Sequence, residues 1–184
     1  MKKIMAVILA IIVILGALIV PKYNKLVKLD NEVDLAYSQV QVVVKRRADL
    51  IPNLVETVKG YATHEEETFL QVTEARAGID SAKNIDELSQ ANEELNTAVN
   101  RLNFVVESYP ELKANQNFQD LQVQLESSEN RISTERQRFN DTVKQYNEAV
   151  RSFPMNLLAG LFGFEKKSYF EISEQDQQVP NVSF

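Results

Sequence analysis

Side chains that could carry chemistry gather in a short stretch between residues 45 and 55. The stretch contains Arg46, Arg47, Asp49, Pro52 and Asn53. Apolar residues around it recur every three or four positions, the pattern of one buried helical face, at Leu26, Leu29, Val33, Ala36, Val40, Val43, Leu50 and Leu54. Arg47 occupies one position of that series. Because an unpaired buried charge costs several kcal/mol, Arg47 must pair with a carboxylate or reach water along its own stem.

Pro52 interrupts the same helical pattern. Proline removes a backbone donor and crowds the carbonyl four residues earlier, so we expect a kink there. A polar position and a predicted kink therefore coincide. They indicate where a structural centre lies in the fold, but they indicate no reaction.

Further polar candidates lie near other apolar stripes: Glu107, Glu129, Glu135 and Arg136. Glu135 replaces an apolar residue in its own stripe, as Arg47 does. Facing carboxylates in a bundle can bind two metal ions, but such sites use Glu-x-x-His pairs, which this sequence lacks. We therefore favour a buried ion-pair layer that fixes helix register, with no cofactor. A metal-binding or enzymatic bundle is kept as the alternative.

The remaining catalytic chemistry is sparse. Cysteine is absent, which excludes disulfides, thiolate catalysis and cysteine-ligated metals. The one histidine, His64, directly precedes three glutamates and cannot form a metal-binding helical face with them. Neither a glycine-rich phosphate loop nor a nucleophile elbow occurs in the sequence. We predict that the protein is not an enzyme.

Composition indicates an all-helical protein with an acidic body. Glycine and proline number five each in 184 residues, and the apolar positions keep helical spacing. The net charge of -6 conceals five lysines that precede every acidic residue; without them, 15 basic residues face 26 acidic ones. Such a surface is repelled by phosphate backbones, so we expect no nucleic-acid binding.

An uncharged apolar segment runs from Ile4 to Val20, with lysines on both sides. At about 1.5 Å per residue, a helix of this length is a short but sufficient span of a bilayer. Residues 1–21 are therefore predicted to be a single transmembrane anchor. A cleaved signal peptide is disfavoured, because Leu18 and Val20 occupy positions where cleavage requires small residues. The flanking lysines nearly balance, so the side of the membrane that carries the body stays open.

The first helix after the anchor is expected to continue to about Gly60. A second helix is predicted from a capping box at Thr63 and Glu66 and from an apolar series over residues 69–79. One continuous helix to residue 82 is the alternative, since the helical phase is roughly kept across Gly60.

Two further stripes have clearer limits. Asn84 and Glu87 form a capping box before a stripe that stops at Pro110 and comprises Leu88, Ala91, Leu95, Ala98, Leu102, Val105 and Tyr109. Asn115 or Asn117 caps the last long helix. Its stripe carries aromatic residues at the seven-residue spacing of a coiled-coil-like core, with Phe118, Leu121, Leu125, Ile132, Phe139, Tyr146 and Phe153.

These lengths predict an all-α fold, with an N-terminal transmembrane helix followed by an antiparallel up-and-down four-helix bundle over residues 22–165. The first and last helices of the bundle are each long enough to span about 55 Å. They are therefore placed as neighbours, and the last helix returns toward the membrane.

A short apolar segment over residues 153–164 follows the last helix and cannot span a bilayer. It either caps the open end of the bundle or contacts the membrane interface, through Leu157, Leu158, Leu161 and Phe162. Residues 166–184 are predicted to be a flexible polar tail.

Four separated motifs, in this order, resemble the LemA family of bacterial membrane proteins. They are RRADLIPNLV at 46–55, VKGYATHE at 58–65, ESYPELKAN at 107–115, and ENRI at 129–132 with Arg136, Phe139 and Asn140 beyond it. The resemblance extends from the anchor to about Phe164. It implies bacterial origin, one N-terminal membrane helix and a four-helix bundle, and it supplies no reaction. From it we carry over only the expectation that the stretch from Arg46 to Asn53 is a structural or interaction centre.

The function predicted from these features is that of a membrane-anchored helical scaffold or adaptor of the bacterial envelope. Its expected partners are the membrane and other membrane or envelope proteins, and self-association between copies is left open. The expected localisation is the cell membrane, with a single pass. Two hypotheses compete with this one: the metal-binding or enzymatic bundle, and a membrane-shaping protein that acts through the C-terminal apolar segment.

Overall fold

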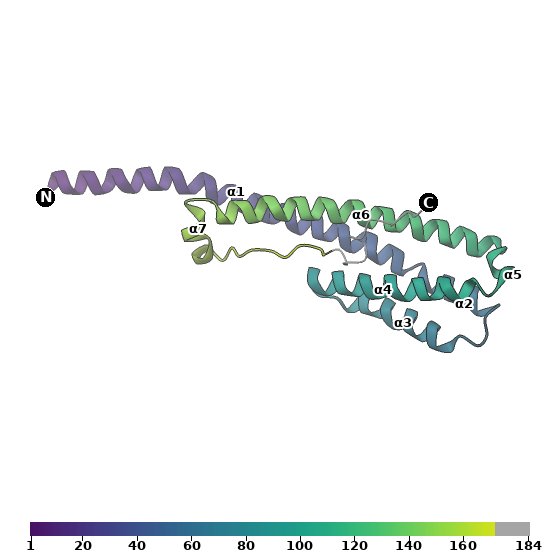
Figure 1. Cartoon of the computed structure of the whole chain (residues 1–184). Helices are drawn as coiled ribbons and strands as arrows, with labels where there is room; N and C mark the ends of the chain where they lie inside the picture. Colours follow the sequence, from purple (N-terminus) through teal and green to yellow (C-terminus); the bar gives the residue numbers. More distant parts are fainter. Residues whose placement is uncertain (172–184) are drawn as a thin grey trace, which may run out of the picture.

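The computed structural model describes residues 1–171, and all their regular secondary structure is helical (Figure 1). The elements are α1 (Lys2–Ala48), α2 (Ile51–Lys59), α3 (Glu66–Ser81), α4 (Ile85–Val106), α5 (Pro110–Lys113), α6 (Gln116–Arg151), α7 (Met155–Leu158) and the short 3₁₀ helix η1 (Ala159–Phe162). The all-helical class predicted from the sequence is confirmed for this part of the chain.

Helix α1 unites the predicted anchor with the first helix of the body. Its residues from Ile4 to Val20 are almost all exposed, and this stretch is long and apolar enough to cross a membrane. Pro21 lies inside α1 without ending it. Beyond it, one face of the helix is buried: Leu26, Leu29, Val33, Ala36, Val40, Val44, Arg47 and Ala48.

The buried face follows the predicted series at most positions, including Arg47 and Leu54, and departs from it by one residue at two positions beyond Val40. Val44 is fully buried, whereas Val43 is partly buried, and Ile51 rather than Leu50 lies in the core. A strict alternation of three and four has a period of 3.5 residues, whereas a straight α-helix has about 3.6, so buried positions advance gradually around the helix.

The interruption predicted from Pro52 is confirmed, because α1 ends at Ala48 and α2 begins at Ile51. The carbonyl that Pro52 crowds, four residues earlier, belongs to Ala48, the last residue of α1. The missing N–H of Pro52 costs little in the first turn of α2, where backbone amides have no helical partner.

The chain breaks a second time at Gly60, which follows the last residue of α2, and α3 begins at Glu66. The alternative of one helix to residue 82 is therefore wrong. The predicted cap at Thr63 is also wrong, because Glu65 holds the N-cap position and makes no side-chain cap hydrogen bond. Ala62 is fully buried in the connection, so the turn packs against the core before the helix starts.

The other predicted caps are present. Asn84 accepts a hydrogen bond from the backbone amide of Glu87 (2.9 Å) at the start of α4. Asn115 accepts one from the amide of Phe118 (3.1 Å) at the start of α6. These caps satisfy amides that lack a partner within the helix.

Two helices end earlier than their stripes suggested. α4 stops at Val106 instead of Tyr109, and α6 stops at Arg151, which leaves Phe153 outside the core and 77% exposed. In both cases a proline follows, and the residue before proline avoids the helical conformation. The helix therefore has to end before Tyr109 in one case and before Phe153 in the other.

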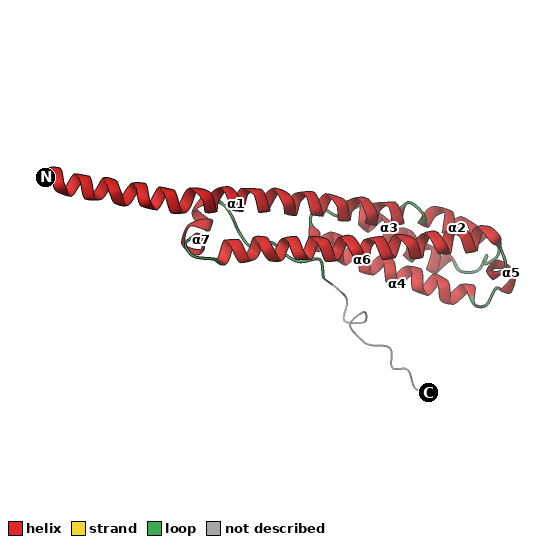
Figure 2. Ribbon diagram, turned by 90° about the horizontal axis from the view of Figure 1, so that it is seen from above, coloured by secondary structure: helices red, strands yellow, loops and turns green. Residues whose placement is uncertain are grey.

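The long helices pack as two pairs of unequal length, α1 along α6 and α3 along α4, while α2 contacts both α3 and α6 (Figures 1 and 2). α6 has 36 residues, whereas α3 and α4 have 16 and 22. The shorter pair therefore covers only the part of the α1–α6 pair that is farther from the N-terminus. We call residues 22–34 of α1 with 140–151 of α6 the near half, and residues 35–139 the far half. The predicted four-helix bundle over residues 22–165 does not describe the near half, which contains two long helices.

The C-terminal segment packs against both helices of the near half. After α7 and η1 the chain runs back along α6 without regular secondary structure (Figure 1). Phe170 in this segment is 1% exposed. Residues 166–171 thus differ from the free polar tail expected from the sequence, because they cover apolar surface that no helix covers there. Residues 172–184 of that predicted tail lie outside the described residues.

Candidate functional site

Arg47 is the most deeply buried charged residue that the structure describes, with 6% of its surface exposed. Its Nη1 lies 2.7 Å from Glu129 Oε2 on α6 and donates a hydrogen bond to Asn96 Oδ1 on α4. One guanidinium therefore connects three helices.

The electrostatics of this contact are those of a structural ion pair. Burial lowers the pKa of Arg47, and the nearby Glu129 carboxylate opposes that shift. The guanidinium stays charged, because the ordinary pKa of arginine is far above neutrality. The Glu129 side chain is 37% exposed as a whole, but the Oε2 atom that faces Arg47 is buried. Arg47 Nε has no hydrogen-bond partner among the described residues, so the polar layer is only partly satisfied.

The other residues of the predicted centre lie on the surface. Four of them lie in or beside the turn between α1 and α2 and are exposed: Arg46, Asp49, Pro52 and Asn53. Asp49 Oδ1 lies 3.9 Å from Arg76 Nη2 on α3. The stretch therefore supplies one core residue and a helix break, and it does not form a cluster.

Glu107 and Glu135 do not join Arg47. Glu107 falls in the turn beyond the end of α4, where its carboxylate lies 2.6 Å from Lys113 Nζ. Glu135 is half-buried and lies 4.0 Å from Arg138 Nη1. Of the residues considered for a buried layer, the structure brings together Arg47 and Glu129, and it adds Asn96, which the sequence did not indicate.

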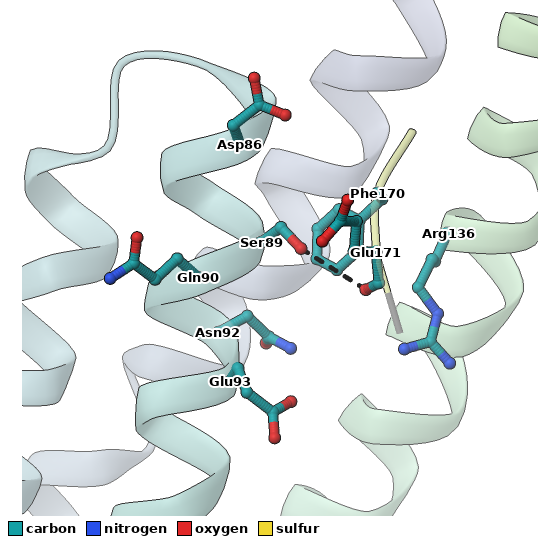
Figure 3. Close-up of a pocket in the computed structure, with 8 residues that line it drawn as sticks. All are labelled: Asp86, Ser89, Gln90, Asn92, Glu93, Arg136, Phe170 and Glu171. Atoms are coloured by element: carbon teal, nitrogen blue, oxygen red, sulfur yellow. Dashed lines mark hydrogen bonds between the residues drawn. The ribbon is translucent and has the colours of Figure 1, made fainter. Parts of the chain in front are cut away.

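Arg136 lines a hollow of about 520 Å³ between α4 and α6 (Figure 3). Its neighbours there are Asp86, Ser89, Gln90, Asn92, Glu93, Phe170 and Glu171. Ser89 donates its hydroxyl to the carbonyl of Glu171 (3.4 Å) and is not paired with a base. Within residues 1–171, no group of three or more histidine, cysteine or carboxylate side chains is arranged to hold a metal ion.

The predicted membrane-contact residues lie at the end of the near half. Leu157, Leu161 and Phe162 are 69%, 82% and 47% exposed, and Leu158 is half-buried. Phe162 stacks edge-on against Tyr23 of α1, with ring centroids 5.2 Å apart. This apolar surface therefore lies beside the point where α1 leaves its exposed apolar segment. In contrast, Met155 and Ala159 of the same segment are buried and cover the end of the core.

A second polar constellation, missed from the sequence, holds the C-terminal segment against α6. Asn147 donates to the carbonyl of Lys167 and accepts from its amide, both at 2.9 Å. Asn140 makes the same pair of hydrogen bonds with Phe170, at 3.0 and 2.8 Å. The available signal was two asparagines seven residues apart in a helix whose buried aromatic residues repeat at seven.

Lys167 adds a charged contact to this constellation. Its Nζ lies 2.7 Å from Asp30 and 2.8 Å from Asp34, both on α1, and 5.3 Å from the ring centroid of Tyr146. Burial lowers the pKa of Lys167, but hydrogen bonds from its ammonium to Asp30 and Asp34 outweigh burial and raise the pKa overall.

The fold and these contacts define a class: an all-helical protein with a membrane-type N-terminal helix and a body held together by structural polar contacts. The model of the LemA family matches residues 36–184. The chain therefore belongs to the LemA family, as its sequence motifs predicted.

Three relatives show how far the similarity extends. Magnetosome protein MamQ 2 of Paramagnetospirillum magneticum is 24% identical over 190 residues, which cover 89% of this chain and 70% of the relative. Protein LemA of Metamycoplasma hominis is 25% identical over 157 residues, covering 84% and 71%. Magnetosome protein MamQ of Magnetospirillum gryphiswaldense is 25% identical over 175 residues, covering 81% and 64%. These names specify no reaction.

Proposed function

We propose that this LemA-family protein is a membrane-anchored helical scaffold or adaptor of the bacterial envelope. The observation that carries the proposal is the continuity of α1, whose 47 residues include both the exposed apolar segment and a buried face of the body. A continuous helix couples the body to the anchor directly, whereas a flexible linker would leave it free to move away. In this proposal, residues 4–20 cross the cell membrane once and the acidic body stands beside it.

The polar contacts support a structural role. Arg47 and Glu129 hold α1 against α6, and buried ion pairs of this kind serve register in helical assemblies. In the far half, where α3 and α4 pack with α1, α2 and α6, we propose the up-and-down four-helix arrangement expected from the sequence. The proposed activity is binding of other membrane or envelope proteins, without catalysis.

An exposed apolar line on α1 is the surface that we assign to such partners. Leu35 and Val42 are 63% and 62% exposed, and residues seven apart lie on the same side of a helix. The line belongs to the helix that carries the anchor, so a partner in the same membrane could reach it.

In-cell photocrosslinking tests this assignment. A photoreactive residue at Val42 of the full chain should capture a defined membrane or envelope protein, reproducibly. The same residue at Leu70, which is 58% exposed but lies on α3, serves as the matched control. Loss of the captured protein when Leu35→Asp is added would support the proposal. Capture of lipid alone, or equal capture from Leu70, would contradict it.

Contact of the C-terminal segment with lipid is a second candidate function, and the exposure of Leu157, Leu161 and Phe162 favours it. Apolar side chains that lie beside the exit of a membrane helix are suited to the bilayer interface. This contact would add a second attachment to the membrane and is the form of membrane shaping that the structure allows.

The absence of tryptophan from the sequence gives this candidate a clean test. Leu161→Trp, in full chains reconstituted into vesicles, should show fluorescence quenching by brominated lipids. Phe104→Trp is the control, because Phe104 is also 82% exposed but lies near the end of α4 in the far half. Equal quenching of the two variants, or none in either, would reject interfacial contact.

A further inference from the structure

The face of α6 that carries Asn140 and Asn147 binds the main chain of a polypeptide. Each asparagine amide offers one donor and one acceptor, and each uses both on the backbone of a single residue of the C-terminal segment. This pairing is the one that a neighbouring β-strand would make, and it places no demand on the side chain of the bound residue.

The spacing of the two asparagines matches that of an extended chain. Seven residues of α-helix advance about 10.5 Å, and three residues of polyproline-II-type extended chain, one turn that returns the main chain to the same side, advance about 9 Å. Asn147 binds Lys167 and Asn140 binds Phe170, which are three residues apart. Helix α6 therefore presents two binding positions at extended-chain spacing, along which the segment runs antiparallel.

Two side-chain contacts add selectivity to this main-chain binding. Lys167 places its ammonium between Asp30 and Asp34, and Phe170 is buried. The site thus fits an extended segment with a lysine and an aromatic residue three positions later. Ser168 Oγ extends the contact to Asp86 on α4 (3.3 Å).

We propose that this site also accepts the same segment, residues 164–171, from a second copy of the chain, so that anchored copies are linked by segment exchange. In the exchanged pair, Lys167 of one copy contacts Asp30 and Asp34 of the other. The main chain of the same segment binds Asn140 and Asn147 of that other copy. Exchange conserves each of these contacts and changes only the chain that supplies the ligand.

Three features favour exchange of the C-terminal segment between copies. The segment adds no helix to the core, and its hydrogen bonds to α6 run through two asparagines. Gly163 precedes it with φ of 80°, a conformation that glycine adopts without strain, so the connection can reorient there. Anchors in one membrane hold copies side by side, which raises their effective concentration. The inference rests on the proposed scaffold only in that the anchors share a membrane.

The absence of cysteine allows a direct test. Two full-length chains with different tags are produced together in the membrane, one carrying Ser168→Cys and the other Asp86→Cys, and a short thiol crosslinker is added. Exchange predicts a crosslinked pair that carries both tags. The matched control replaces Asp86→Cys by Glu94→Cys, because Glu94 lies on the side of α4 that faces α3. A single chain that carries both Ser168→Cys and Asp86→Cys measures the contact within one copy.

Adding Asn140→Ala and Asn147→Ala only to the chain that carries Asp86→Cys should reduce the two-tag product by roughly tenfold or more. The Ser168→Cys segment keeps four hydrogen bonds in its own copy but would lose them in the other, and tenfold corresponds to about 1.4 kcal/mol. Crosslinking only within one copy, with a two-tag yield no higher than that of the Glu94 control, would overturn the proposal. So would a two-tag product that survives loss of both asparagines. Partner capture at Val42 is independent of this result, so failure of exchange and failure of the adaptor function can be told apart.

Discussion

The near half of the body is covered by a segment without regular secondary structure, whereas the far half is covered by two helices. In the far half, α3 and α4 bury apolar stripes against α1, α2 and α6. In the near half, two asparagines of α6 bind the main chain of Lys167 and Phe170, and Asp30 of α1 binds the Lys167 ammonium. Apolar burial has no direction, whereas hydrogen bonds do. Both halves bury apolar side chains of α1 and α6. The far half adds the side-chain volume of α3 and α4 and one buried charge, whereas the segment that covers the near half is held by the placement of a few polar groups.

Arg47→Ala should produce the largest effect and should act on the far half. Removing Arg47 leaves the Glu129 carboxylate without its partner, and breaking a buried pair costs about 3 to 5 kcal/mol. Because Glu129 is partly exposed, the lower end of that range is expected. The midpoint of denaturant unfolding measures the change. Arg46→Ala is the control, since Arg46 is exposed on the same turn, and equal shifts for the two variants would contradict the structural role of the pair.

Asn147→Ala should come next and should act on the near half. It leaves the amide and carbonyl of Lys167 without their partners, which costs about 1 to 3 kcal/mol. Limited proteolysis of the C-terminal segment should accelerate, while unfolding of the far half should change little. Asn147→Asp should be intermediate, because a carboxylate can accept from the Lys167 amide but cannot donate to its carbonyl. A shift of the whole unfolding transition equal to that of Arg47→Ala would remove the distinction between the halves.

These expectations also show where sequence reasoning worked. Most positions of the apolar stripes, the break at Pro52 and the caps at Asn84 and Asn115 depend on local spacing, and the structure shows them. Arg47 was found because it violates a stripe, and Glu129 was one of several carboxylates that could have faced it. Choosing among those carboxylates required the three-dimensional register of α1 and α6.

The near half could not be predicted in this way. Asn140 and Asn147 occupy ordinary helical positions, and their role depends on a segment some twenty to thirty residues away in sequence. Polar composition predicted a free tail from residue 166, whereas contacts with main chain are independent of composition. Glu107 was misplaced for a related reason, because α4 ends before Pro110 and moves this residue into a turn.

Lys167→Met should show a smaller, pH-dependent effect on the near half. The pKa of Lys167 is raised in the folded state, so its contribution is complete below the unfolded value, about 10.4. The contribution is lost as pH rises through the higher folded value. The difference in segment protection between the wild type and Lys167→Met should be constant from neutral pH to about pH 10 and should shrink above it. Burial also raises the pKa of Tyr37 and Tyr146. Comparing the two proteins removes the effect of Tyr37, whereas the charge of Lys167 lowers the pKa of Tyr146, so the variant moves the Tyr146 titration further upward. A difference that already disappears between neutral pH and about pH 10 would contradict the assignment.

Glu107→Gln should have the smallest effect. Its contact with Lys113 is a surface ion pair, and such pairs contribute about 0 to 1 kcal/mol. Unfolding of this variant should match the wild type within roughly 0.5 kcal/mol. A loss comparable to that of Arg47→Ala would mean that Glu107 does belong to the buried layer.

The distinction between the halves depends most directly on whether residues 167–170 are held to α6 in the membrane-anchored chain. Amide hydrogen exchange of the full chain in vesicles measures this at the two bound residues. The amides of Lys167 and Phe170 donate to Asn147 and Asn140, so they should exchange slowly. Both should become fast in the Asn140→Ala, Asn147→Ala variant, while α4 stays protected. Fast exchange of both amides in the wild type would show that the segment is free, and the account of the near half would then be wrong.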